Sequence, residues 1–251
     1  MNTTPNIHAM IVAAGRGNRF GAAIAKQYTK INGQTLLQHS VTRLASSGYI
    51  DHCYLVIAAD DEVASTLTYT LPMNYVVGGA ERWQSVRAGV SAILGSGADK
   101  SDLVLIHDAA RPAVPTEDID SVITAAMSEP YGAILAAPVA DTLKLSTALP
   151  AKQLDDHNDD CTNDNDYIKT TVNRQYMWQA QTPQVFRVGE LSRLLDYINE
   201  HQLHITDEAS AFEYLELPIR LVTGSRQNIK LTFPDDAIVL AAILTAQVSS
   251  R

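Results

Sequence analysis

The chain has little cysteine, no long apolar run and fewer basic than acidic residues, and each shortage excludes a class of protein. Cys53 and Cys161 are the only two cysteines among 251 residues. They lie far apart and fit no metal-binding spacing, so we expect free thiols in a reducing compartment. No apolar run approaches the roughly 20 residues that span a bilayer. The first residues lack a basic region followed by a long apolar region, so we expect no signal peptide and a cytoplasmic location.

The net charge is −9, from 19 Lys and Arg residues against 28 Asp and Glu residues. Nucleic-acid binding needs a basic face, so this balance argues against a nucleic-acid partner. Hydrophobic residues make up 46% and charged residues 19% of the chain. That balance is typical of globular proteins and excludes a disordered chain, a collagen and a coiled coil. The length alone allows one large domain or two small ones.

Much of the negative charge lies in one segment. Residues 151–166 contain six aspartates, three asparagines and one lysine, which gives this segment −5 of the net −9. A segment this polar cannot contribute to a core, so we expect a solvated excursion at the tip of a two-stranded arm. A calcium loop is the alternative, but the glycine and the terminal glutamate that such a loop requires are missing.

Short apolar runs alternate with segments of helical periodicity over most of the chain. The predicted strands cover residues 7–13, 52–58, 74–77, 102–106, 133–138 and 219–222. The predicted helices are 35–46, a short one after Asp60, 81–94, one capped at Thr116, 188–199, 207–214 and one after Pro234 and Asp235. This alternation predicts an α/β fold whose mostly parallel sheet is covered by helices on both faces. Ligands of such sheets gather at the carboxyl ends of the strands.

The alternation breaks in the middle of the chain. Residues 141–146 and 169–173 are predicted to be extended, on either side of the acidic segment. We therefore expect one domain over residues 1–251, with an arm at about 138–180 that carries an acidic insert at 151–168.

A glycine-rich segment, AAGRGNRFG, follows the first predicted strand at residues 13–21. Glycines let backbone N–H groups approach a bound phosphate, and Arg19 and Lys26 would add positive charge. A dinucleotide-binding fingerprint needs glycine where Phe20 stands, and the chain has no GxxxxGK[ST] motif. A NAD-dependent dehydrogenase and a P-loop ATPase are therefore disfavoured. The alternative to a phosphate loop is a tight turn with two solvated cations.

Two further motifs follow predicted strands. Gly78 and Gly79 form a second glycine turn, which opens a helix and suits close contact with a base or ribose. The motif HDAARP places Asp108 at the carboxyl end of a strand, where a carboxylate can hold Mg²⁺. For Asp108 and Arg111, a local ion pair that caps the next element is the alternative.

Several motifs, taken in order, resemble those of the 2-C-methyl-D-erythritol 4-phosphate cytidylyltransferase family: AAGRGNRF with AKQY, GGAER, HDAARP, APVADTLK, TPQ, TDEAS and NIKLT. The resemblance runs from about residue 8 to residue 245, apart from the acidic insert. The glycine loop is shared by sugar-phosphate nucleotidyltransferases in general, whereas HDAARP, the APV-DT turn and ITDEAS are more specific. The resemblance implies a single doubly wound, mostly parallel sheet, of the Rossmann-like nucleotidyltransferase type, with a protruding β-arm.

The resemblance also implies a reaction. CMP passes from CTP to 2-C-methyl-D-erythritol 4-phosphate and pyrophosphate is released, in the non-mevalonate route to isoprenoid precursors. The acceptor phosphate attacks the α-phosphorus in line, so catalysis consists of positioning and charge stabilisation. Mg²⁺, or another divalent cation, is the implied cofactor with Asp108 as its ligand, and the implied assembly is a homodimer formed through the arm. Ribitol 5-phosphate as acceptor and a non-catalytic nucleotide-binding module are the alternatives.

The resemblance assigns roles to residues of this chain. The catalytic residues it implies are Arg19, Lys26 and Lys230. The nucleotide-binding residues it implies are Ala14, Gly15, Arg16, Gly79, Ser85 and Asp108. The residues it implies for the acceptor are Arg111, Thr142, Arg174, Thr182 and Asp207, of which Thr142 and Arg174 reach the neighbouring subunit's site. A solvated position for Arg16 and a helix cap for Asp207 stay open. Glu208 could also assist the acceptor site, but we expect it to cap the helix. The chain departs from the family at Ala25, where a proline is usual, and at the acidic insert.

Overall fold

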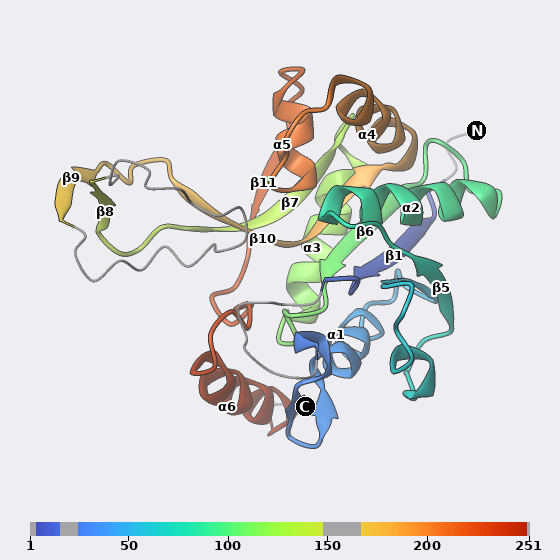
Figure 1. Ribbon diagram of the computed structural model, residues 1–251, viewed down its shortest axis with the longest axis horizontal. Helices are drawn as coiled ribbons and strands as arrows, with labels where there is room; N and C mark the ends of the chain where they lie inside the picture. Colours follow the sequence, from blue (N-terminus) through green and yellow to red (C-terminus); the bar gives the residue numbers. More distant parts are fainter. Residues whose placement is uncertain (1–3, 16–24, 148–166, 250–251) are drawn as a thin grey trace.

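The computed structural model describes residues 4–15, 25–147 and 167–249. A seven-stranded sheet runs through the centre of the molecule, in the order β11-β7-β10-β6-β1-β4-β5 (Figure 1). Its strands are β1 (Ile7–Val12), β4 (Cys53–Ile57), β5 (Met73–Val77), β6 (Leu103–Asp108), β7 (Gly132–Pro138), β10 (Trp178–Arg187) and β11 (Arg220–Thr223). Strand β10 is antiparallel to β6 and β7, whereas the other neighbours pair in parallel. The predicted mostly parallel α/β sheet is therefore confirmed.

Helices cover both faces of this sheet. They are α1 (Leu36–Leu44), α2 (Arg82–Gly95), α3 (Thr116–Met127), α4 (Val188–His201), α5 (Glu208–Glu213) and α6 (Asp236–Ser249). Helices α1 and α3 pack on one face, with Ala9 and Ile11 of β1, and α2, α4 and α5 pack on the other, with Met10. Alternate side chains of a strand point to opposite faces, so the apolar run of β1 supplies both cores. Helix α6 packs on a third, smaller cluster with α1.

Three short pieces connect these elements. A hairpin of β2 (Lys30–Ile31) and β3 (Gln34–Thr35) precedes α1. The turn η2 (Lys26–Tyr28) leads into it. The short helix predicted after Asp60 is a single 3-10 turn, η3 (Ala64–Thr66). No described helix is long and apolar enough to cross a membrane.

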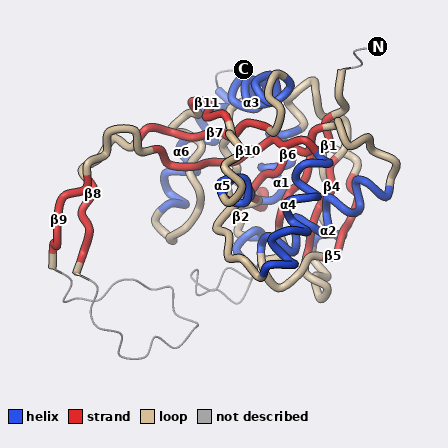
Figure 2. The backbone as a smooth tube through the Cα atoms, turned by 90° about the horizontal axis from the view of Figure 1, so that it is seen from above, coloured by secondary structure: helices blue, strands red, loops and turns tan. Residues whose placement is uncertain are grey.

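A two-stranded antiparallel sheet of β8 (Leu143–Ser146) and β9 (Ile168–Val172) projects from the main body (Figures 1 and 2). Strand β7 leads out to it and β10 returns from it, which agrees with the extended pieces predicted around the break in the alternation. The acidic segment at 151–166, with its calcium-loop alternative, lies outside the described residues.

Strand β10 and the start of α3 differ from what the sequence predicted. The strand at 178–187 was not predicted. It contains Pro183, although prolines are rare in central strands because they lack an N–H group. The pairing of β10 with β7 shifts register between Ala180 and Gln184, and this irregularity accommodates the proline. Thr116 is not an N-cap either. Pro115 precedes the helix without a side-chain hydrogen bond, and Thr116 Oγ1 lies 2.6 Å from Ser46 Oγ.

Candidate active site

A pocket of about 230 Å³ lies where β1 and β6 end side by side. Both are parallel strands, so this is the edge of the sheet at which ligands are expected. The residues that line it come from β1 and the loop after it, from the η2 turn, from the start of α2, from the end of β6 and from the segment before α6. They are Val12, Ala13, Ala14, Gly15, Lys26, Gln27, Gly79, Ala80, Glu81, Arg82, Ser85, Asp108, Ala109, Ala110 and Lys230.

The glycine turn after β5 forms one wall of the pocket. A Cβ atom on Gly78 would lie 2.6 Å from Ser85 Oγ and 2.8 Å from Ala14 Cβ, so only glycine allows the two loops to approach this closely. The buried Ser85 hydroxyl accepts a hydrogen bond from the Gly79 N–H over 3.2 Å. The turn is thereby fixed beside Ala14, with backbone groups available to a ligand.

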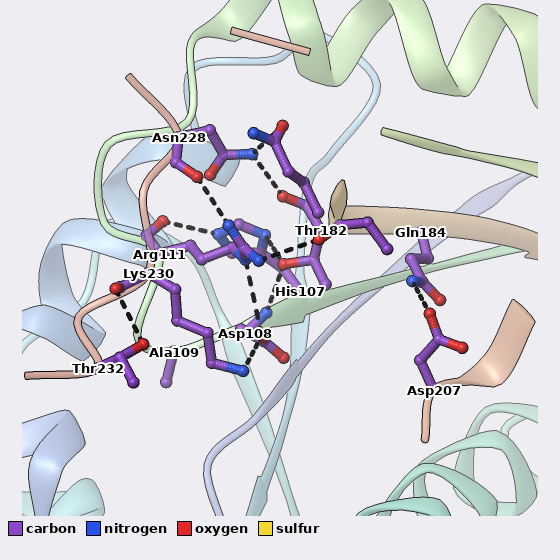
Figure 3. Close-up of polar contacts among 12 residues, drawn as sticks. His107, Asp108, Ala109, Arg111, Thr182, Gln184, Asp207, Asn228, Lys230 and Thr232 are labelled. Carbon is purple, nitrogen blue, oxygen red and sulfur yellow. Dashed lines mark hydrogen bonds and ion pairs between the residues drawn. The ribbon is translucent and has the colours of Figure 1, made fainter. Parts of the chain in front are cut away.

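Asp108, the last residue of β6, is the centre of a charge cluster and is only 9% exposed. Lys230 Nζ lies 2.9 Å and Arg111 Nε 3.7 Å from its Oδ2 atom, and Arg82 Nη2 lies 3.2 Å from Oδ1. Burial raises the pKa of Asp108, but these three cations outweigh burial and hold that pKa well below its usual range. The carboxylate is therefore charged at neutral pH. Figure 3 shows the contacts with Lys230 and Arg111.

A second carboxylate stands behind Arg82. Both oxygens of Glu208, whose side chain is fully buried, accept hydrogen bonds from Arg82 Nη1. Glu208 is the first residue of α5 and not its cap, which corrects the sequence prediction. The cap is Asp207, whose Oδ1 accepts from the Ser210 N–H over 3.0 Å while its Oδ2 accepts from Gln184 Nε2 over 2.9 Å.

A buried hydrogen-bond network fixes the end of β6 against β10. The Asp108 N–H donates to Thr182 Oγ1 over 3.0 Å, and that hydroxyl lies 3.0 Å from His107 Nδ1 (Figure 3). His107 Nε2 lies 3.0 Å from the Arg111 carbonyl oxygen. Burial lowers the pKa of His107 to about 4, so the ring is neutral at pH 7. Thr182 then donates to Nδ1, and Nε2–H donates to Arg111.

The Arg111 guanidinium is held by backbone oxygens. Its Nη1 donates to the Asn228 carbonyl over 2.7 Å and its Nη2 to the Ala180 carbonyl over 3.3 Å. Asn228 Nδ2 in turn donates to the Thr182 carbonyl over 2.8 Å. These bonds join β6, β10 and the segment that carries Lys230 into one rigid unit beside the pocket.

The model of the 2-C-methyl-D-erythritol 4-phosphate cytidylyltransferase (IspD) family matches residues 7–246 of the chain. The chain belongs to this family. It is 64% identical to the cytidylyltransferases of that name from Psychrobacter cryohalolentis and Psychrobacter arcticus, over the whole chain and 96% and 95% of those proteins. A crystal structure of 4-diphosphocytidyl-2C-methyl-D-erythritol synthase is 33% identical, with a TM-score of 0.78 over 96% of this chain and 100% of that one. The predicted family, enzyme class and fold are confirmed.

The structure brings most of the residues predicted for this cytidylyltransferase to one place. Those that line the pocket are Ala14, Gly15, Lys26, Gly79, Ser85, Asp108 and Lys230. Arg111 and Thr182 lie beside it, through their contacts with Asp108. Arg16 and Arg19 lie outside the described residues. Thr142 and Arg174 are exposed and lie at the arm, which projects away from the body (Figure 1).

Arg82 was not predicted as a site residue, and Glu208 was expected to be a helix cap. Both stand inside motifs that carried the resemblance, GGAER and TDEAS, and that position was the only signal in the sequence. Their contact joins residues 126 positions apart, so local patterns could not show it.

Ala25, the residue that departs from the family, has φ of −56°. That angle lies in the range to which proline is restricted, so this backbone matches the one a proline would impose. Ala25 therefore adopts a backbone angle that a proline could also adopt.

The described residues contain no group of three or more His, Cys, Asp or Glu side chains able to hold a metal ion. Asp108 supplies one ionised carboxylate at the pocket. Mg²⁺ is usually held by one or two carboxylates together with substrate phosphates, so this donor fits a cation that shares its ligands with a triphosphate.

Proposed function

We propose that the chain transfers CMP from CTP to 2-C-methyl-D-erythritol 4-phosphate, giving 4-diphosphocytidyl-2-C-methyl-D-erythritol and pyrophosphate. The observation that carries this proposal is the convergence of Lys26, Lys230 and Asp108 on one pocket that is walled by the Gly79 turn. Membership of the cytidylyltransferase family supports the same reaction. The reaction would supply the non-mevalonate route to isoprenoid precursors.

The nucleotide would lie along the two glycine loops. Ala14, Gly15 and Gly79 offer backbone groups to the cytosine, and Ser85 fixes the turn that presents them. Bases are discriminated by hydrogen-bond donors and acceptors at fixed positions, which a tight backbone turn provides with little conformational freedom.

The phosphates would lie between the cations. Lys26 and Lys230 face the pocket from opposite ends of the chain, and Arg16 and Arg19 follow Gly15 in the sequence. The acceptor phosphate is itself the nucleophile, so the protein needs no side-chain nucleophile. Fixed cations lower the barrier because they stabilise the charge that crowds around the α-phosphorus in the transition state.

Asp108 would hold Mg²⁺. When bound, the ion neutralises phosphate charge and orients phosphate oxygens. Lys230, whose side chain is 43% exposed, lies on the same carboxylate. Asp108 thus orients a catalytic lysine as well as offering an oxygen ligand to the metal.

The acceptor site would be shared between two copies of the chain. Arg111, Thr182 and Asp207 would serve it from the main body, and Thr142 and Arg174 from the arm of a second copy. The arm presents exposed apolar side chains at Leu145, Tyr167, Ile168 and Tyr176, which a subunit contact would bury. Residues 1–251 would form one domain with the arm at about 138–180, and the cytoplasmic location stays a prediction.

An assay of pyrophosphate release shows which of the two candidate acceptors the protein uses. The protein, CTP and Mg²⁺ are incubated with 2-C-methyl-D-erythritol 4-phosphate or with ribitol 5-phosphate. We expect turnover of the first acceptor, and turnover of ribitol 5-phosphate alone would overturn the proposed substrate.

Lys26→Ala separates catalysis from simple nucleotide binding. We expect kcat to fall on the order of 100-fold because a transition-state cation is lost, with a smaller loss of CTP affinity measured by calorimetry. The exposed Lys30, four residues later, gives the matched control Lys30→Ala, which should leave both quantities unchanged. Equal losses of kcat and affinity in Lys26→Ala would instead favour a non-catalytic binding module.

A further inference from the structure

We propose that Glu208 is a positioning residue of the transfer reaction, acting through Arg82 on Asp108; this inference rests on the proposed function. The three residues form a chain of contacts from the protein interior to the pocket. Glu208 binds Arg82 Nη1 with both oxygens, and Arg82 Nη2 lies 3.2 Å from Asp108 Oδ1. The guanidinium is therefore shared between a buried carboxylate and a carboxylate at the pocket.

The three side chains differ in exposure, and Glu208 is the one that is completely buried. The Glu208 side chain is 0% exposed, that of Asp108 is 12% exposed and that of Arg82 is 30% exposed. Arg82 lines the pocket, whereas Glu208 does not. Glu208 cannot touch a substrate from its position, and its effect on the reaction must pass through the guanidinium.

Each residue stands at the end of an element. Arg82 is the first residue of α2, Asp108 the last of β6 and Glu208 the first of α5. The capping hydrogen bond of Asp207 fixes the start of α5, and so fixes the backbone that carries the Glu208 side chain. The chain of contacts thus ties three elements together at the mouth of the pocket.

The charges explain why a second carboxylate is needed. Three cations surround Asp108, and without Glu208 the whole charge of Arg82 would fall on Asp108 or on the pocket. Arg82 uses Nη1 for Glu208 and Nη2 for Asp108, so the two carboxylates together hold the planar guanidinium in one orientation. Asp108 then keeps its second oxygen for Lys230, and Arg82 stays at the wall of the pocket.

Stability alone does not account for this pair. A buried ion pair contributes little net stability, because the cost of removing two charges from water offsets their attraction, and apolar replacements are often neutral. A pair kept for stability alone would therefore be replaceable by apolar side chains with no loss of rate. A pair that positions Asp108 would not.

The test compares Glu208→Gln with wild type in the pyrophosphate assay with 2-C-methyl-D-erythritol 4-phosphate. We expect kcat to fall about 10- to 100-fold, with the KM for CTP changed less than about three-fold because Arg82 still lines the pocket. Asp196→Asn is the matched control. It removes the charge of another carboxylate that pairs with an α2 arginine, Arg87, at an exposed position away from the pocket.

The double variant Arg82→Met/Glu208→Met separates positioning from folding, and does so even where Glu208→Gln folds poorly. It removes both charges, and we expect thermal stability near that of wild type with kcat still reduced at least 10-fold. A double variant that recovers stability and rate together would overturn the proposal, as would a Glu208→Gln protein with wild-type kcat. Failure of wild type to use the acceptor would instead count against the proposed function.

Discussion

At the scale of single residues, the site is organised by three cations that face one buried carboxylate. Lys230, Arg82 and Arg111 converge on Asp108, and Thr182 holds the Asp108 N–H. Backbone and side chain of Asp108 are therefore both fixed before any ligand binds. Such preorganisation lowers the cost of reorganising the site during the reaction.

His107 makes the stability of this region depend on pH. Its pKa is about 4 in the folded protein, against an ordinary value of 6.5, because burial disfavours the charged ring. Between these values the unfolded chain binds the proton and the folded chain does not, so stability rises with pH in this window. We expect this residue to remove about 2 kcal/mol of unfolding free energy between pH 7 and pH 5.

Urea unfolding at a series of pH values, in metal-free buffer, measures this contribution. His107→Gln removes the titrating ring but keeps a donor and an acceptor, so its unfolding free energy should fall less between pH 7 and pH 5. If the unfolding free energy of wild type and of His107→Gln fell equally between pH 7 and pH 5, the pH dependence could not be assigned to His107.

At the scale of elements, the strands that composition marks most plainly are those with apolar side chains toward both cores. β1 and β6 are buried along nearly their whole length, so their composition alone marks them. β10 escaped prediction because Gln179, Gln181 and Pro183 break its apolar pattern, and its pairing partners lie far away in the sequence. The TPQ motif implied Thr182 as an acceptor-site residue, although the strand that carries Thr182 was not predicted.

The site also combines residues that local motifs mark with residues that only distant contacts bring together. Lys26 and Asp108 stand in local motifs that point to phosphate or metal chemistry, and Lys230 stands in a motif that carries the family resemblance. The structure brings all three to the pocket. The ion pair of Arg82 with Glu208 forms only when the fold brings the first residue of α5 to the first residue of α2, which no local pattern encodes. Residues that act through other residues are therefore the part of a site that sequence reasoning misses.

Helix α5 is short, and its cap is expected to govern where it begins. Asp207→Ala should lower the free energy of unfolding by about 1 kcal/mol, because an N-cap is lost. Asp207→Asn should retain most of that stability, since asparagine caps helices about as well as aspartate. Chemical denaturation measures both changes.

The same two variants test the acceptor role predicted for Asp207. Both oxygens of this carboxylate already accept hydrogen bonds within the chain. A raised KM for the acceptor in Asp207→Asn, at unchanged stability, would show that the carboxylate also serves the substrate. An unchanged KM would leave Asp207 as a cap alone.

At the scale of the whole molecule, the arm stands apart from the sheet that forms the pocket (Figure 2). Its exposed apolar side chains and its distance from the pocket of its own chain both favour a partner subunit. Under the proposed function, each pocket combines Lys26 of one copy with Arg174 of the other.

Mixed dimers test this shared site. Lys26→Ala and Arg174→Ala are each expected to be nearly inactive alone. Co-expression of the two variants forms hybrid dimers in which one of the two pockets has both native residues, so about a quarter of wild-type activity should return. Absence of any recovery, with hybrid dimers detected by mass, would show that Arg174 does not act across subunits.

The course of β7 and β10 has a mechanical consequence. The hydrogen bonds between antiparallel strands lie across the strand direction, so a force along the arm loads the bonds of β10 together, in shear, instead of opening them one by one. β10 also carries Thr182, which holds the Asp108 N–H. A force along the arm is therefore resisted by the same strand that fixes the Asp108 backbone beside the pocket.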